Sequence, residues 1–304
     1  IENFQKYIKD VSIVLHVSDS FFKQYTLSDI KSYKDVYINP EHLKTTWSDI
    51  LKAHISNFHF IQSKIDFDYF ILHASNDMYI KYGFQKYVQQ FDAGFHVRKV
   101  TKNNSHWWVG NKALQDTSLR KMMGYCNQEV IIGSQVESSF YKKELLIRII
   151  EIIEKFYSPS KIHTIYPREE IYFSTIASAL VESNAIGGIT TFSEVHRFDR
   201  LLWKIRDFTR KLYDSLGGRW IFSENFYYKI ERFYGDKLFK SRFYKTTPRI
   251  IRRLLKEDIA YINRNSYLDD GSGKFRLYNI NIFSVKRINR TMDDTVRRYI
   301  TNLP

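Results

Sequence analysis

Hydrophobic and polar residues alternate along the first eighty positions with periods that switch between strand and helix. Short apolar runs at residues 11–17 (VSIVLHV) and 36–38 (VYI) end in polar residues, and they predict buried strands. Apolar residues at 47–61 then recur at helical spacing, which predicts an amphipathic helix with Thr46 as its N-cap. Residues 68–75 (DYFILHAS) predict a further strand. This order indicates an α/β fold, with a mostly parallel sheet flanked by helices.

The pattern is less even beyond this point. Residues 97–128 are polar and aromatic with weak periodicity. We expect them to form a long excursion that faces an acceptor substrate, the molecule that receives a transferred group. Strands are predicted at 129–134 and 275–283, and a helix at 142–156. Another helix is predicted to open at Pro167 and to run to about residue 181.

Charge divides the chain unevenly. The formal net charge is +14, and 25 of the 47 Lys and Arg residues, but only 12 of the 33 Asp and Glu residues, follow residue 194. We expect a catalytic core at 1–194, a basic helical insertion or subdomain at 195–265, and a C-terminal segment at 266–304 that completes the core with a strand and phosphate-binding residues. Such a basic part suits an anionic partner: a nucleotide diphosphate, an anionic membrane surface or nucleic acid.

The cysteine content and the hydropathy indicate where the protein works. The single cysteine, Cys126, excludes a disulfide within the chain and indicates a reducing compartment. No apolar stretch reaches the roughly eighteen residues that a membrane-spanning helix needs. We therefore expect a cytoplasmic protein, and peripheral contact with the inner face of the membrane stays open. Whether a strand or an anchor precedes Ile1 also stays open.

Two acidic clusters are candidates for chemistry. Residues 168–170 (REE) open a predicted helix, where the helix dipole alone favours acidic side chains. The alternative is a general base that removes a proton from an acceptor hydroxyl, and one carboxylate suffices for an inverting sugar transfer. Residues 66–68 (DFD) have the Asp-x-Asp order of a metal site, but they precede the apolar strand rather than follow it. We therefore expect no metal site there.

A basic cluster follows the strand predicted near the C-terminus. Lys286, Arg287 and Arg290 are candidates for binding the phosphates of a donor, and the alternative is a solvated basic surface. No P-loop and no Gly-x-Gly-x-x-Gly fingerprint accompanies them. Trp107 could stack on a sugar ring, and packing is the alternative for this side chain.

Five segments in sequence order resemble motifs of the core-2/I-branching β-1,6-N-acetylglucosaminyltransferase family and its bacterial relatives. These segments are residues 16–19 (HVSD), 46–54 (TWSDILKAH), 67–81 (FDYFILHASNDMYIK), 133–135 (GSQ) and 167–175 (PREEIYFST). The resemblance implies a GT-A-like fold and an inverting, metal-independent glycosyltransferase. It also implies that the protein takes part in polysaccharide biosynthesis.

The resemblance assigns roles to particular residues. Glu170 takes the catalytic-base position, because its distance to Thr175 matches the family spacing. Lys286, Arg287 and Arg290 match the basic cluster that neutralises the donor diphosphate. The remaining residues expected to line the donor and acceptor pocket are His16, Ser75, Asp77, Trp107, Gly133, Ser134 and Glu169.

The expected substrates follow from the same resemblance. The donor would be a UDP-linked nucleotide sugar, and the acceptor a glycan or a lipid-linked saccharide, with no cofactor and no specific nucleic acid. The alternatives are a nucleic-acid-binding protein or a peripheral membrane protein that uses the basic C-terminal third.

Overall fold

The computed structural model describes most of the chain outside the basic region. The described residues are 1–23, 30, 32–46, 49–100, 108–157, 166–192, 246–255, 267–269, 275–277 and 281–304. Most of the expected insertion at 195–265 lies outside these residues, and so does Trp107.

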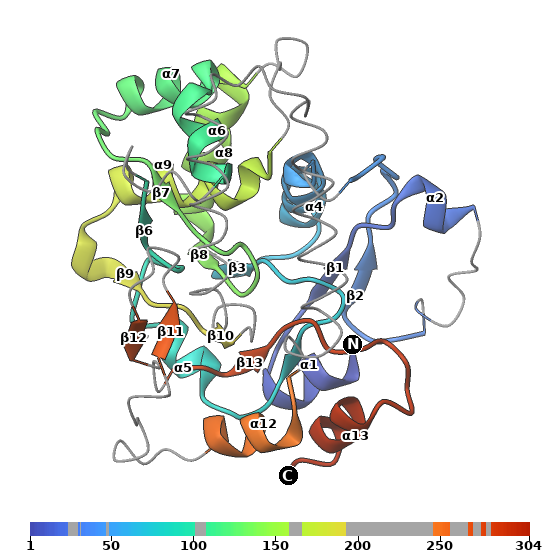
Figure 1. Ribbon diagram of the computed structural model, residues 1–304. Coiled ribbons are helices and arrows are strands. Elements are labelled where there is room, and N and C mark those ends of the chain that lie inside the picture. Colours follow the sequence, from blue (N-terminus) through green and yellow to red (C-terminus); the bar gives the residue numbers. More distant parts are fainter. Residues whose placement is uncertain are drawn as a thin grey trace, which may run out of the picture.

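Helices and short strands are interspersed through the described residues (Figure 1). The helices are α1 (Glu2–Tyr7), α2 (Asp19–Phe22), α4 (Leu51–Gln62), α5 (Phe84–Val88), α6 (Trp108–Gln115), α7 (Thr117–Tyr125), α8 (Lys143–Phe156), α9 (Tyr172–Leu180), α12 (Pro248–Leu255) and α13 (Thr295–Thr301), with 3-10 turns η2 (Arg168–Glu170) and η3 (Ser183–Ala185). The strands are β1 (Ile13–Leu15), β2 (Val36–Ile38), β3 (Tyr69–Ile71), β4 (Met78–Tyr79), β5 (Ala93–Gly94), β6 (Arg98–Lys99), β7 (Ile132–Gly133), β8 (Phe140–Lys142), β9 (Ile186–Gly187), β10 (Thr191–Phe192), β11 (Tyr267–Asp269), β12 (Phe275–Leu277) and β13 (Ser284–Val285).

The fold is mixed α/β, as the sequence predicts, but the described strands form several small sheets of mixed direction. The first two strands pair in parallel, as expected from their order. A second sheet has the order β3-β8-β5-β9, in which β8 runs antiparallel to both β3 and β5. A third sheet has the order β10-β13-β4, and β6 pairs antiparallel with β7. The described residues therefore show no single large parallel sheet.

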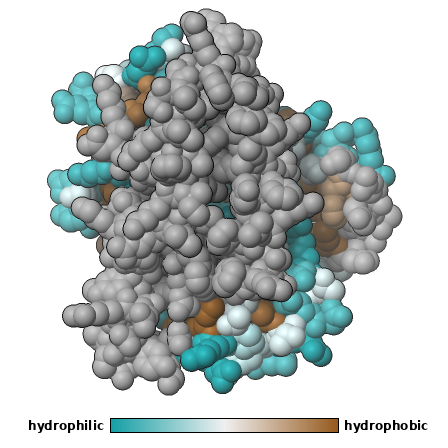
Figure 2. Space-filling model, in the orientation of Figure 1, coloured by the Kyte–Doolittle hydropathy of each residue, from teal (hydrophilic) through white to brown (hydrophobic). Residues whose placement is uncertain are grey.

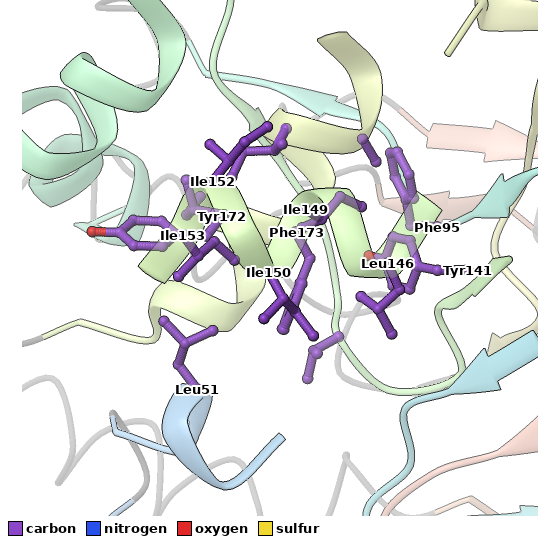
Figure 3. Packing of buried hydrophobic residues seen from close by; sticks show 14 of the residues in the cluster. Leu51, Phe95, Tyr141, Leu146, Ile149, Ile150, Ile152, Ile153, Tyr172 and Phe173 are labelled. Atoms are coloured by element: carbon purple, nitrogen blue, oxygen red, sulfur yellow. The ribbon is translucent and has the colours of Figure 1, made fainter. Parts of the chain in front are cut away.

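The main hydrophobic core surrounds α8. Its apolar face packs against α9, α7 and the buried side of α4. Figure 3 shows this packing from close by, with labelled residues Leu51, Phe95, Tyr141, Leu146, Ile149, Ile150, Ile152, Ile153, Tyr172 and Phe173. Because α9 directly follows η2, this core also fixes the position of the acidic turn.

Two smaller apolar clusters hold the C-terminal elements against the N-terminal half. One joins β4 and β13 to α12 and α13, with Ile251, Val285 and Ile300 fully buried. Figure 2 shows hydrophobic residues between hydrophilic ones along the lower edge, where Figure 1 places α12 and α13. The other cluster joins α1 and α5 to β4. Residues 281–304 therefore contribute to the packing of both of these clusters.

Three predictions about local structure differ from what is observed. The helix after residue 46 begins at Leu51 without a side-chain cap, because Thr46 and Asp49 pair with each other in a short β-bridge. The excursion at 97–128 contains α6 and α7, and Asp116 caps the second of them. The helix expected from Pro167 begins as a 3-10 turn, and its α-helical part starts at Tyr172.

Candidate functional site

The acidic turn η2 carries Glu170 at the edge of the main core. Pro167, which has no backbone N–H, stands before the turn and fixes the entry of the chain. The backbone N–H of Ser134 donates to the carbonyl of Glu170 at 2.7 Å, so the segment after β7 holds the end of the turn. Thr175 donates its hydroxyl to the carbonyl of Ile132 at 2.9 Å and accepts from the Ile132 N–H. The segments 133–135 and 167–175 thus lie side by side.

The Glu170 carboxyl has neighbours of both charge signs. Burial, and after it the negative charge of Glu137, raise its pKa to about 7. Lys286, Arg98 and Arg287 lie close enough to act in the opposite direction. A carboxyl with a pKa near neutrality can both take up and release a proton at physiological pH.

Glu137 and Lys286 form an ion pair beside this carboxyl. The Lys286 ammonium donates to Glu137 Oε2 at 3.0 Å, and the exposed fractions of the two side chains are 7% and 23%. Burial opposes ionisation of Glu137, but the charge and the hydrogen bond of Lys286 outweigh it, so the pKa of Glu137 is lowered. One carboxylate is therefore held charged next to another that titrates near neutrality.

The predicted basic segment near the C-terminus also contacts the loop that follows β3. Arg290 donates to the hydroxyl of Ser75 at 2.7 Å, and the N–H of Ile288 donates to the carbonyl of Asn76 at 3.0 Å. Arg287 is exposed and has a φ of 64°, a left-handed backbone that marks a sharp turn after β13. The C-terminal basic residues and the loop after β3 therefore meet, although over two hundred residues separate them in sequence.

Asp77 lies in the same loop after β3, but its side chain is buried and bonds to neighbouring residues of the protein. It is 3% exposed, and its Oδ2 accepts from the N–H of Ala74 at 2.9 Å and faces His73 Nδ1 at 3.2 Å. The Nε2 of that histidine lies 2.8 Å from the hydroxyl of Tyr79. Asp77 therefore shapes the loop after β3 through a buried hydrogen-bond chain.

Histidines extend the cluster toward β1. Burial lowers the pKa of His54 to about 4, although Glu137 favours its charged form, and His16 lies close enough to oppose that charge. Burial and His42 likewise lower the pKa of His16. The Nε2 atoms of His16 and His54 are buried and have no hydrogen-bond partner among the described residues. His16, a residue predicted for the pocket, thus lies near His54, and His54 in turn lies near Glu137.

The remaining predicted pocket residues lie around η2. Gly133 is the cross-strand partner of Arg98, and Ser134 is buried and accepts from the N–H of His96 at 3.1 Å. Glu169 is 3% exposed, and burial together with the charge of Glu170 raises its pKa well above the ordinary value. Within the described residues, Glu169 Oε2 has no hydrogen-bond partner.

The described residues contain no group of three or more His, Cys, Asp and Glu side chains arranged to hold a metal ion. Asp66, from the Asp-x-Asp order, is exposed and pairs with Lys143 at 2.6 Å. In the same parts of the chain, no helix is long and apolar enough to cross a bilayer.

Sequence reasoning overlooked three members of this cluster. No role is predicted from the sequence for Glu137, Arg98 or His54. Glu137 follows the Gly133-Ser134 segment closely, and this position was the available signal. Arg98 carries no such signal, because only the pairing of β6 with β7 places it there.

Comparison with known proteins adds no assignment. No family model matches this sequence, and no curated protein matches it significantly.

Proposed function

We propose that this protein is an inverting glycosyltransferase that works without a metal ion and belongs to the GT-A type. It would move a sugar from a nucleotide sugar, UDP-linked by the resemblance to core-2/I-branching enzymes, to a hydroxyl of a glycan or glycolipid. The observation that carries this proposal is the environment of Glu170, a carboxyl with a pKa of about 7 beside three basic side chains.

Glu170 acts as the general base in this proposal. Its carboxylate takes the proton of the acceptor hydroxyl as the oxygen attacks the anomeric carbon from the face opposite the leaving nucleotide. The bond from the anomeric carbon to the diphosphate oxygen breaks, and the configuration inverts. A pKa of about 7 suits this role, because the group is substantially ionised at neutral pH and still basic enough to accept the proton.

The leaving diphosphate carries negative charge that must be stabilised. Arg287 and Arg290 are exposed in the segment that follows β13, and Lys286 adds a buried positive charge in the same segment. Glu137 accepts one of the three N–H donors of Lys286, which holds this ammonium in place. Charge-assisted hydrogen bonds from such groups can replace a cation on the diphosphate.

A donor screen tests this function. Purified protein is mixed with single nucleotide sugars in excess EDTA, and thermal shift reports binding because a bound ligand stabilises the folded state. Donors that bind are then incubated with glycan and glycolipid acceptors, and NMR of the product reports transfer and anomeric configuration. We expect one donor class to bind and to give an inverted product in EDTA. Strict dependence on added metal, or a retained configuration, would contradict the proposal.

A further inference from the structure

Asp116 is buried at the N-cap of α7 and receives more hydrogen bonds than a helix cap requires. Its Oδ1 accepts from the N–H groups of Ser118 at 2.9 Å and Leu119 at 3.2 Å, which is ordinary capping. Its Oδ2 accepts from the hydroxyls of Tyr166 at 2.6 Å and Tyr172 at 2.7 Å. Oδ1 of Asp116 thus caps α7, and Oδ2 binds a segment that lies about fifty residues further along the chain.

The groups on Oδ2 all come from the segment that carries Glu170. Tyr166 stands four residues before Glu170, and Tyr172 stands two residues after it. Arg168, the first residue of η2, adds its guanidinium with Nε 3.4 Å from Oδ2, and its guanidinium carbon lies 4.6 Å from the Tyr166 ring centre. One carboxylate therefore anchors this segment on both sides of the acidic turn.

The anchoring side chains and the Glu170 carboxyl have different surroundings. Arg168 is 5% exposed, its ionisable neighbours are Asp116 and three tyrosines, and both anchoring tyrosines are fully buried. Glu170 instead has Glu137, Lys286, Arg98 and Arg287 as neighbours. Arg168 and Glu170, two residues apart on one turn, thus lie in two different environments. Because they share this turn, holding Arg168 in place also determines where the Glu170 carboxyl lies.

We infer that Asp116 is a positioning residue for Glu170: it locks the 166–172 segment through Tyr166, Arg168 and Tyr172. It thereby directs the Glu170 carboxyl toward Lys286, Arg98 and Arg287. This inference rests on the proposed function for its catalytic consequence. Misplacing a reacting group by ~1 Å costs on the order of a hundredfold in rate. Asp116 therefore controls turnover without contact with either substrate.

Asp116→Asn separates capping from positioning. Asparagine caps helices as well as aspartate does, so its oxygen keeps the bonds to Ser118 and Leu119. Its NH₂ group cannot accept from the two tyrosine hydroxyls. We expect a folded protein with an unchanged donor KM and a kcat lowered by roughly 10- to 100-fold. An unchanged kcat would overturn the inference.

A second variant excludes a loss of activity that merely follows stability. Tyr166→Phe with Tyr172→Phe in the Asp116→Asn background removes the two unsatisfied hydroxyls, and we expect it to regain thermal stability. If Asp116 positions Glu170, kcat stays low, because the anchors are still missing. Recovery of kcat together with the melting temperature would show a purely structural role and overturn the inference.

A readout independent of transfer separates this inference from the proposed function. NMR titration of ¹³C-labelled glutamate, with Glu170 assigned through the Glu170→Gln spectrum, reports its pKa directly. We expect Asp116→Asn to move that pKa from about 7 toward the ordinary value, because the loosened turn admits water. An unchanged titration would refute the positioning role even in an active enzyme. Absence of transfer by the unmodified protein would refute the proposed function alone.

Discussion

Replacing Glu170 with glutamine should stabilise the folded protein at alkaline pH while removing the proposed transferase activity. The carboxyl has an ordinary pKa of 4.5, and burial with the neighbouring Glu137 raises it to about 7 in the folded state. The folded state therefore binds the proton more tightly than the unfolded state, and stability falls as pH rises from about 4.5 through 7. Glutamine has nearly the same shape as the protonated acid and carries no charge at any pH.

The size of this effect follows from the pKa difference. Each pKa unit corresponds to about 1.4 kcal/mol, so ionising Glu170 costs the folded state about 3–4 kcal/mol at pH 8. Below the folded pKa the cost fades, and we expect less than about 1 kcal/mol at pH 5. For a chain of this length, the difference at pH 8 corresponds to roughly 5 °C in melting temperature.

The assay compares Glu170→Gln with the unmodified protein by thermal unfolding at pH 5 and at pH 8. Glu151→Gln, an equivalent change on the exposed face of α8, is the matched control and should show no such pH dependence. His54 also contributes to the pH dependence, because its lowered pKa makes stability fall as pH drops below about 6.5. The comparison between variants cancels this contribution and those of other titrating groups. A Glu170→Gln protein that is less stable at pH 8, or equally shifted at both pH values, would refute this electrostatic account.

Three further substitutions test other contacts. Glu137→Gln leaves the buried Lys286 charge without its partner 3.0 Å away, so urea unfolding should show a loss of about 2–4 kcal/mol; an unchanged midpoint would contradict the ion pair. Arg290→Ala should raise the donor KM about tenfold, whereas Arg249→Ala on the exposed side of α12 should not; equal effects would remove the specific role of the first. Gly94→Ala places a Cβ 2.1 Å from the fully buried ring of Phe140. Thermal unfolding should therefore report a loss of at least about 2 kcal/mol in the free energy of unfolding, and normal stability would contradict this packing.

Sequence periodicity predicted the elements better than their pairing. The runs at 11–17 and 36–38 contain β1 and β2, and the helix predicted at 142–156 is α8, because local patterns of burial determine both. The direction of β8 against β3 and β5 depends on pairing between distant segments, and no local pattern encodes it. A mostly parallel sheet was therefore an extrapolation from element order.

The candidate site shows the same limit. Glu170 and the basic cluster were predicted because each stands in a recognisable local pattern, and the contact of Arg290 with Ser75 joins two predicted regions. Glu137 and Arg98 stand in no such pattern and enter the site only through tertiary structure. Asp116 was hidden for the same reason, since its tyrosine partners lie fifty or more residues further along the chain.

The most direct test of the account is the turnover of Glu170→Gln with the identified donor and acceptor in excess EDTA. Loss of one general base lowers kcat by on the order of 100- to 10,000-fold, while the donor KM should hold because Arg287 and Arg290 are untouched. Glu151→Gln should turn over normally under the same conditions. Near-normal kcat in Glu170→Gln, or transfer that appears only after a divalent cation is added, would contradict the claim that one glutamate and a basic cluster perform this reaction.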